Sequence, residues 1–243
     1  MDQPPGFIAS NLPDHVCRLR KALYGLKQAP RAWFHQLRSS LLHQGFTACV
    51  SDPSLFIKKH GSHTTYVLIY VDNLIITVSH SSFIDDFVKI LDAKVALKDL
   101  GALHYFLGIE VFHSSSALHL SQQKYICDIL ERSTMSGAKP ISSPAEPRSR
   151  LNQSGDPLLD PTLYRSIVGA LQYVTITRPE ISYVVNRVCQ FMHSPTETHW
   201  AAVKCILRYL KGTLSSGLTL HQATDSRLVA FSDAGWASDL DDC

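Results

Sequence analysis

The chain has 243 residues, of which 45% are hydrophobic, so it is long enough to bury a substantial core. Its formal net charge of +2 neither indicates nor excludes a polyanionic partner. No segment reaches the roughly 18 uninterrupted apolar residues of a membrane span, and the start lacks the apolar stretch of a secretion signal. We therefore expect an intracellular protein of the cytoplasm or nucleus, not secreted and with no membrane partner.

The spacing of the cysteines and the distribution of charge along the chain each limit what the protein can bind. Six scattered cysteines have no disulfide or zinc spacing, which favours free thiols. Residues 1–60 contain eight lysines and arginines against three acidic residues, a surplus suited to phosphate contacts. The residues after Thr224 are acidic instead, so the two ends should not share a ligand.

The first predicted element is a helix from about Pro30 to Gln44, with Gly45 placed to end it. Its apolar stripe consists of residues four positions apart: Trp33, Leu37 and Leu41. Its basic face carries Arg31, His35 and Arg38.

Two β-branched runs follow, at residues 65–71 and 74–78, separated by Asp72 and Asn73. This pattern predicts a β-hairpin that turns at Asp72-Asn73, because Asp and Asn are favoured in two-residue turns. From the pattern alone, the pair is explained by an ordinary Asx turn, with a metal site as the alternative.

The rest of the sequence predicts a helix over 82–96, a strand from Tyr105 to Phe112, and a helix over 122–132. A Pro-, Ser- and Gly-rich stretch over 136–161 predicts a linker and a subdomain boundary. Three helices that form a small bundle are expected next, each opened by a proline: Pro161, Pro179 and Pro195. The third has an apparent capping box from Ser194 to Glu197 and should end at Gly212. A last strand is expected from Leu228 to Ser232.

The sequence also contains an ordered series of short motifs. It runs QPPGF (3–7), LRKALYGLKQAPRAW (19–33), YVDN (70–73), KDLGALHYFLGIEV (98–111), LSQQKYI (120–126), YRSIVGALQYVTITRPEISYVVN (164–186) and HW…ILRYLKGT (199–213). This series resembles the reverse transcriptase of copia-type LTR retrotransposons over nearly the whole length. The resemblance implies an RNA-directed DNA polymerase, a nucleotidyltransferase cut from a longer Pol polyprotein, with an RNA or DNA template-primer and deoxynucleoside triphosphates as partners.

The resemblance also implies a magnesium site. The family uses Mg²⁺ held by converging carboxylates, one on a strand upstream of QPPGF and two at the hairpin turn, normally written YVDD. Here Asp72 matches the first turn aspartate, Asn73 replaces the second, and the upstream aspartate has no counterpart because the sequence begins just before QPPGF. We therefore expect Asp72 as the one remaining metal ligand, a degenerate catalytic pair with Asn73, and no polymerase activity in this chain.

Other site residues come from the same resemblance. The family's contact with template and nucleotide lies at LYGLKQAPRAW, which implies nucleic-acid or nucleotide binding by Lys27, Gln28, Arg31 and Arg38, with Tyr70 beside the turn aspartate. A capped amphipathic helix with a solvated basic face is the alternative. The strand around Phe106, Leu107 and Gly108 resembles the primer-gripping hairpin, or is a plain buried strand.

The segment LVAFSDAGWAS resembles the first strand of an RNase H domain, with Asp233 at the position of its first catalytic aspartate. This segment is too short to form an active RNase H domain, so we expect no RNase H activity. The expected fold is therefore α+β: a partial reverse-transcriptase palm, an antiparallel sheet with helices on one face, followed by a helical thumb and connection and a truncated RNase H-like strand. The expected domains are 1–113 (palm and fingers), 114–160 (start of the thumb and linker), 161–222 (connection) and 223–243 (RNase H). The missing upstream and downstream Pol segments would be partners of such a fragment. A non-catalytic nucleic-acid-binding or interaction remnant is the rival hypothesis, and a translated remnant with no role is the third.

Overall fold

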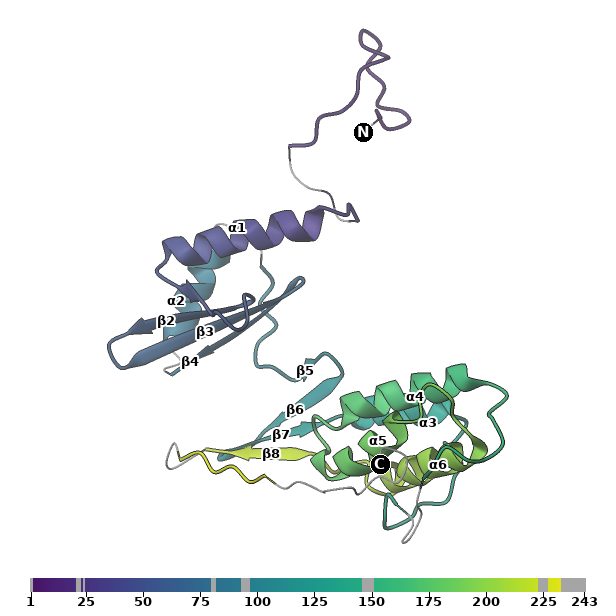
Figure 1. Ribbon diagram of the computed structural model, residues 1–243. Helices are drawn as coiled ribbons and strands as arrows, with labels where there is room; N and C mark the ends of the chain where they lie inside the picture. Colours follow the sequence, from purple (N-terminus) through teal and green to yellow (C-terminus); the bar gives the residue numbers. More distant parts are fainter. Residues whose placement is uncertain are drawn as a thin grey trace. The chain divides into compact units, whose positions relative to one another are not determined.

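The computed structural model describes residues 2–20, 23, 25–79, 82–92, 97–145, 151–222 and 227–232. The fold is mixed α+β, with two four-stranded antiparallel sheets, as the sequence predicts in outline. The chain forms two compact units, Met1–Gly101 and Ala102–Cys243 (Figure 1). Within the described part of the chain, no helix is long and apolar enough to cross a lipid bilayer.

The first unit contains one sheet and two helices. In chain order its elements are α1 (Ala29–His43), β1 (Thr47–Ala48), β2 (Leu55–His60), β3 (His63–Tyr70), β4 (Asn73–Val78) and α2 (Ser82–Asp92). The strands are hydrogen-bonded in the order β1-β2-β3-β4, so each pairs with its neighbour in sequence. Every connection within this sheet is therefore a local antiparallel one.

The predicted helix over 30–44 is confirmed as α1, including its buried stripe. Leu37 and Leu41 are fully buried, and they pack in one cluster with Phe56 and Val67 of the sheet. Gly45 follows the helix with a φ of +84°, and its position lets the Phe46 N–H reach the carbonyl of Leu41 at 3.1 Å. Since the same cluster includes Leu91 of α2, both helices cover one face of the sheet.

The second unit contains a second sheet and a helical core. Its elements are β5 (Tyr105–Phe106), β6 (Ile109–His113), β7 (Ala117–Ser121), α3 (Gln123–Arg132), α4 (Pro161–Val174), the 3₁₀ turn η1 (Pro179–Ile181), α5 (Ser182–Cys189), α6 (Glu197–Gly212) and β8 (Leu218–His221). The sheet order is β5-β6-β7-β8. In Figure 1 the helices of this unit gather at one end of the sheet.

The helices of this unit share one core, as the expected bundle requires, but only α4 is opened by its predicted proline: Pro179 begins η1, and Pro195 precedes the N-cap Thr196 of α6. Ile167 and Leu171 of α4, Val185 of α5, and Leu207 and Leu210 of α6 are completely buried in a single cluster. Asp160 caps α4, because its Oδ1 accepts a hydrogen bond from the Thr162 N–H at 2.9 Å, and Pro161 occupies the first turn.

Several expectations are wrong in detail. The single strand expected from Tyr105 to Phe112 is a hairpin, because Leu107 and Gly108 both have positive φ and turn the chain. Thr196, with an extended backbone, caps α6, so the expected capping box from Ser194 to Glu197 does not form. Residues 227–232 form no strand, and β8 was not predicted.

The expected subdomain boundary over 136–161 is also wrong. Part of this stretch packs on the helical core: Leu151 is buried, and the Leu158 N–H donates to the carbonyl of Pro195 at 3.0 Å. The division lies instead at Gly101, before β5 and not after residue 113, because β5 and β6 pair in the sheet of the second unit. Asp233 and the residues after it lie outside the described residues.

Candidate active site

The β3–β4 hairpin places Asp72 at its tip. Tyr70 pairs with Asn73, so the two turn residues are Val71 and Asp72, one position earlier than the sequence predicts. Val71 has a φ of +52°, in the left-handed region that a β-branched side chain disfavours. The strands flanking the turn contain the buried residues Val67 and Ile69, so Asp72 projects from a rigid support.

Asp72 and Asn73 are both exposed, as expected of a ligand-binding turn. The Asn73 amide lies beside the carboxylate, with Nδ2 donating to Oδ1 of Asp72 at 3.5 Å. The pair thus offers one negative charge and one neutral amide, whereas a pair of magnesium ions requires several converging hard oxygens. Elsewhere in the described residues, no group of three or more His, Cys, Asp or Glu side chains could hold a metal ion. The described side chains do not fit a two-magnesium centre.

The expected nucleic-acid contacts lie just before α1 and along it: Lys27 and Gln28 precede the helix, Arg31 is in its first turn and Arg38 in its second half. Lys27, Gln28, Arg31 and Arg38 are all exposed. Gln28 is the N-cap residue, yet its side chain makes no capping hydrogen bond. The Arg31 Nε–H reaches Nε2 of His35 at 3.5 Å, which keeps the two side chains on one face of the helix. The segment is therefore a solvent-facing cationic surface next to a helix N-terminus, an arrangement that suits phosphate.

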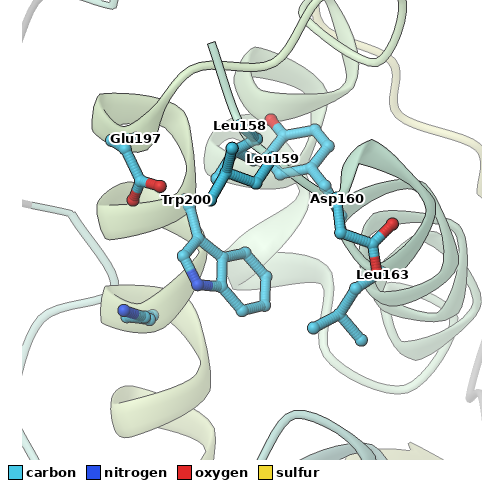
Figure 2. A pocket seen from close by; sticks show the side chains of 8 residues that line it. Leu158, Leu159, Asp160, Leu163, Glu197 and Trp200 are labelled. Carbon is cyan, nitrogen blue, oxygen red and sulfur yellow. The ribbon is translucent and has the colours of Figure 1, made fainter. Parts of the chain in front are cut away.

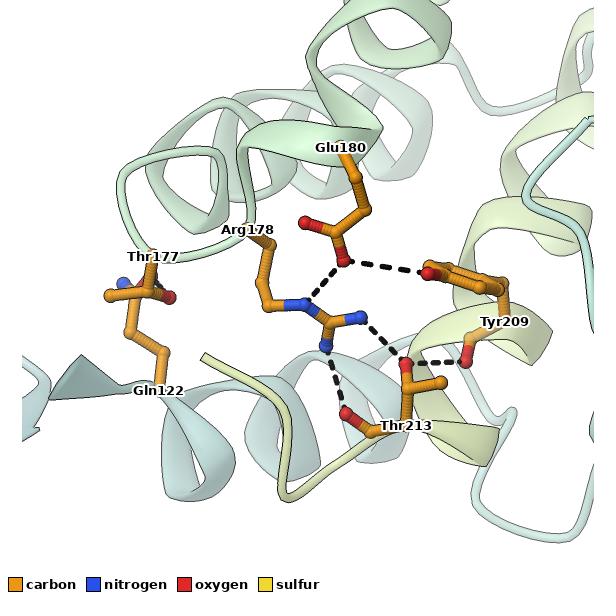
Figure 3. A network of polar contacts seen from close by, with 6 residues as sticks. All are labelled: Gln122, Thr177, Arg178, Glu180, Tyr209 and Thr213. Atoms are coloured by element: carbon orange, nitrogen blue, oxygen red, sulfur yellow. Dashed lines mark hydrogen bonds and ion pairs between the residues drawn. The ribbon is translucent and has the colours of Figure 1, made fainter. Parts of the chain in front are cut away.

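A buried arginine, which the sequence did not single out, organises the second unit (Figure 3). Arg178 is 1% exposed, and its Nε donates to Oε1 of Glu180 at 2.6 Å. Its two terminal nitrogens donate to the carbonyl and the Oγ1 of Thr213, at 2.9 and 2.7 Å. The guanidinium also lies 5.6 Å from the ring centre of Tyr209. These contacts tie η1 to the end of α6, so the role of Arg178 is structural.

Beside this network, Thr177 donates its hydroxyl to Oε1 of Gln122 at 2.7 Å, which joins the end of β7 to the turn after α4. Gln122 is fully buried, and its Nε2 has no hydrogen-bond partner among the described residues. The sequence TRPE (177–180) is therefore explained by the structural contacts of its side chains. Only the clustering of polar residues in an otherwise apolar bundle could have indicated it beforehand.

A surface hollow of about 340 Å³ lies between the start of α4 and the start of α6 (Figure 2). Its wall is formed by Leu158, Leu163, Tyr164 and Trp200, with Asp160, Glu197 and Lys204 at its margin. The Lys204 ammonium lies 5.7 Å from the Trp200 ring centre. The Tyr164 hydroxyl points away from the solvent and donates to the carbonyl of Val188 at 2.7 Å, and burial raises the pKa of this phenol.

Comparison with known proteins identifies the family of the chain. Residues 1–147 match the family model described as "Reverse transcriptase (RNA-dependent DNA polymerase)", which covers the α1 segment and both hairpins. The chain belongs to the reverse transcriptase family.

Relatives of this reverse transcriptase chain are Pol polyproteins of copia-type transposons. It is 51% identical over its full length to the retrovirus-related Pol polyprotein from transposon RE1 of Arabidopsis thaliana, of which it spans 17%. It is 36% identical, over 99% of its length, to the corresponding polyprotein from transposon TNT 1-94 of Nicotiana tabacum, of which the match covers 19%. No solved structure matches the chain.

A shorter relative is an uncharacterized mitochondrial protein of Arabidopsis thaliana, 44% identical over 172 residues, which are 71% of this chain and 72% of that protein. The site residues predicted from the sequence lie in two places in the described structure. Asp72, Asn73 and Tyr70 are at the β3–β4 hairpin, and the cationic residues lie just before α1 and along it. Asp233 is not described.

Proposed function

We propose that this chain is the part of a copia-type reverse transcriptase that binds template-primer duplex but does not polymerise DNA by itself. In this proposal the first unit is part of the palm, with an antiparallel sheet covered by helices on one face. The helices of the second unit are the thumb and connection, and the segment from residue 223 is the start of an RNase H-like domain.

The observation that carries the proposal is the chemistry of the β3–β4 tip. Asp72 lies exposed at a rigid turn, which is the position a metal-binding carboxylate needs, and its neighbour Asn73 has no charge. Loss of one carboxylate from a shared two-ion site weakens both metal positions, because the ligands act together. The exposed cations at the start of α1 retain the capacity to bind phosphate.

The partners implied are an RNA or DNA template-primer, deoxynucleoside triphosphates and the rest of a Pol polyprotein. The chain's own residues contribute electrostatic attraction through Lys27, Arg31 and Arg38, and orientation of Asp72 through the two strands on either side, which pack on one apolar cluster. The rival function, a non-catalytic nucleic-acid-binding or interaction remnant, uses the same cationic surface but gives no preference for a template-primer duplex and no role to Asp72.

Primer extension on a primed RNA template with magnesium tests the proposal. We expect no incorporation by the native chain above that of Asp72→Ala, and only a modest gain in divalent-ion affinity for Asn73→Asp, since one restored carboxylate does not complete the site. Robust template-dependent incorporation by the native chain, abolished in Asp72→Ala, contradicts the proposal. Sustained polymerisation by Asn73→Asp shows that the two turn aspartates suffice.

A further inference from the structure

The hollow between the start of α4 and the start of α6 is held in shape by the segment that precedes α4 (Figure 2). The Leu158 N–H donates to the carbonyl of Pro195 at 3.0 Å. The Glu197 N–H donates to the carbonyl of Asp156, also at 3.0 Å, so the segment is fastened across the start of α6. Asp160 then caps α4, which fixes the other end of this wall. A site that is formed before its ligand arrives loses less entropy on binding.

The inside of the hollow is apolar and aromatic. Tyr164 and Trp200 meet edge-on there, with ring centres 6.4 Å apart and an interplanar angle of 61°. The Tyr164 hydroxyl is not offered to a ligand, because it donates to the carbonyl of Val188 inside the core. Leu159 is fully exposed and Leu163 is 37% exposed, so the hollow presents apolar surface to solvent that a ligand could bury.

The margin of the hollow is acidic. Asp160 and Glu197 are exposed, and Figure 2 shows them on opposite sides of the Trp200 ring. Neither carboxylate has an ion-pair partner among the described residues. Lys204, the basic residue that lines the hollow, holds its ammonium 5.7 Å from the Trp200 ring centre. The lining therefore carries two carboxylates against one ammonium.

A ligand that fits this hollow combines apolar surface with positive charge. A purely apolar ligand would take water from the two carboxylates without replacing it. A nucleic-acid backbone brings phosphates, which the carboxylates repel. A polypeptide segment with a large apolar side chain next to an arginine or lysine supplies both parts, and an arginine can donate two hydrogen bonds to one carboxylate. The volume of about 340 Å³ suits a few side chains of such a segment.

We propose that the hollow between α4 and α6 is a docking site for a segment of another protein in which large apolar side chains adjoin arginine or lysine. The apolar side chains cover Leu159, Leu163 and Trp200. The basic side chain is bound between Asp160 and Glu197. This inference is independent of the proposed binding of template-primer duplex, because no residue of the first unit takes part in it.

The test uses the full chain and three synthetic peptides of equal length. The first alternates leucine and arginine, the second has serine in place of each leucine, and the third has glutamate in place of each arginine. Binding is followed by the NMR signal of the Trp200 indole N–H, which is assigned by its loss in Trp200→Phe. The leucine–arginine peptide should shift this signal to saturation, and the other two should bind at least about fivefold more weakly.

Variants of the chain test the two halves of the site separately. Asp160→Asn combined with Glu197→Gln removes both charges, while asparagine keeps the helix cap. It should weaken the leucine–arginine peptide about fivefold at low salt and much less at high salt. Leu159→Ala, at a fully exposed side chain, should weaken the same peptide about threefold at either salt concentration. The matched control, Asp128→Asn combined with Glu131→Gln, removes two exposed charges from α3 and should keep the native affinity.

Three results with the peptides would each overturn the proposal. They are an unmoved Trp200 signal with the leucine–arginine peptide, equal binding of the glutamate peptide, and the same loss of affinity in the two double variants. A competition with a single-stranded oligonucleotide adds a fourth. If the oligonucleotide shifts the Trp200 signal and displaces the peptide, the hollow binds nucleic acid and the proposal fails.

Discussion

At the scale of single residues, apolar side chains set the register of the β3–β4 hairpin and with it the place of its turn. Asp and Asn are favoured in turns, and this placed the turn at Asp72-Asn73. The register is instead set by the apolar residues: Val67 pairs with Ile76 and Ile69 with Leu74, which directs all four to the covered face of the sheet. Burial across the strands outweighed the local preference, and the turn begins at Val71.

Val71 is strained by this register, which gives a prediction. A β-branched residue in the left-handed region costs about 1–2 kcal/mol, and glycine avoids this cost while losing more conformational entropy on folding. Val71→Gly should therefore raise the free energy of unfolding of the first unit by about 0.5–1 kcal/mol. Val78→Gly, in regular strand conformation at the end of β4, is the matched control and should lower it. Denaturant titration measures both, and equal destabilisation by the two changes would show that Val71 is not strained.

At the scale of elements, α6 shows which features of a helix can be predicted from its sequence. Its apolar stripe and its end at Gly212 followed from the sequence, because both depend on residue type and spacing. Its start did not, because the N-cap is Thr196 and its capping-box partner is a histidine: the Thr196 N–H donates to Nδ1 of His199 at 3.0 Å. Nε2 of the same ring donates to the carbonyl of Asn152 at 2.9 Å, a contact that no local pattern reveals.

This cap should make stability depend on pH. Burial lowers the pKa of His199, and its neutral ring, stacked on Phe191 at 3.9 Å between centres, accepts at Nδ1 and donates at Nε2. A folded pKa below the unfolded one means that the stabilisation is complete above about pH 6.5 and is lost as the pH falls through that value towards the folded pKa. His199→Gln should flatten this part of the curve. Thermal unfolding of both proteins between about pH 7.5 and 5.5 decides it, and parallel curves would exclude His199 as the source.

At the scale of the whole molecule, fold class and family were predictable and the division of the chain was not. The α+β class follows from the order of apolar periods, which the two sheets and their helices bear out. The composition of residues 136–161 predicted a linker, but Leu151 and Leu158 attach part of this stretch to the helical core. Strand β8 was missed since it is four residues long and pairs with β7, about 100 residues earlier in the chain.

The charge distribution of the whole chain supports the last prediction. Residues 1–60 carry the basic surplus, and the exposed Lys27, Arg31 and Arg38 place part of it just before α1 and along that helix. Each phosphate that a cation neutralises releases counterions, so affinity should fall steeply with salt and depend little on nucleotide sequence. Replacing these three residues by alanine should weaken binding and lower the slope of log affinity against log salt by about 2.

A matched control separates position from net charge. The triple variant Lys124→Ala, Arg132→Ala and Lys139→Ala removes three exposed charges from the second unit and changes the net charge of the chain by the same amount. If the α1 segment is the binding surface, this control keeps the native slope, because the slope reports the phosphates neutralised by contacting cations and these three residues would make no such contact. Fluorescence anisotropy with a labelled single strand across a salt series measures all three proteins. Equal losses in the two triple variants would show that the α1 segment is not the nucleic-acid contact and that only overall charge attracts the strand.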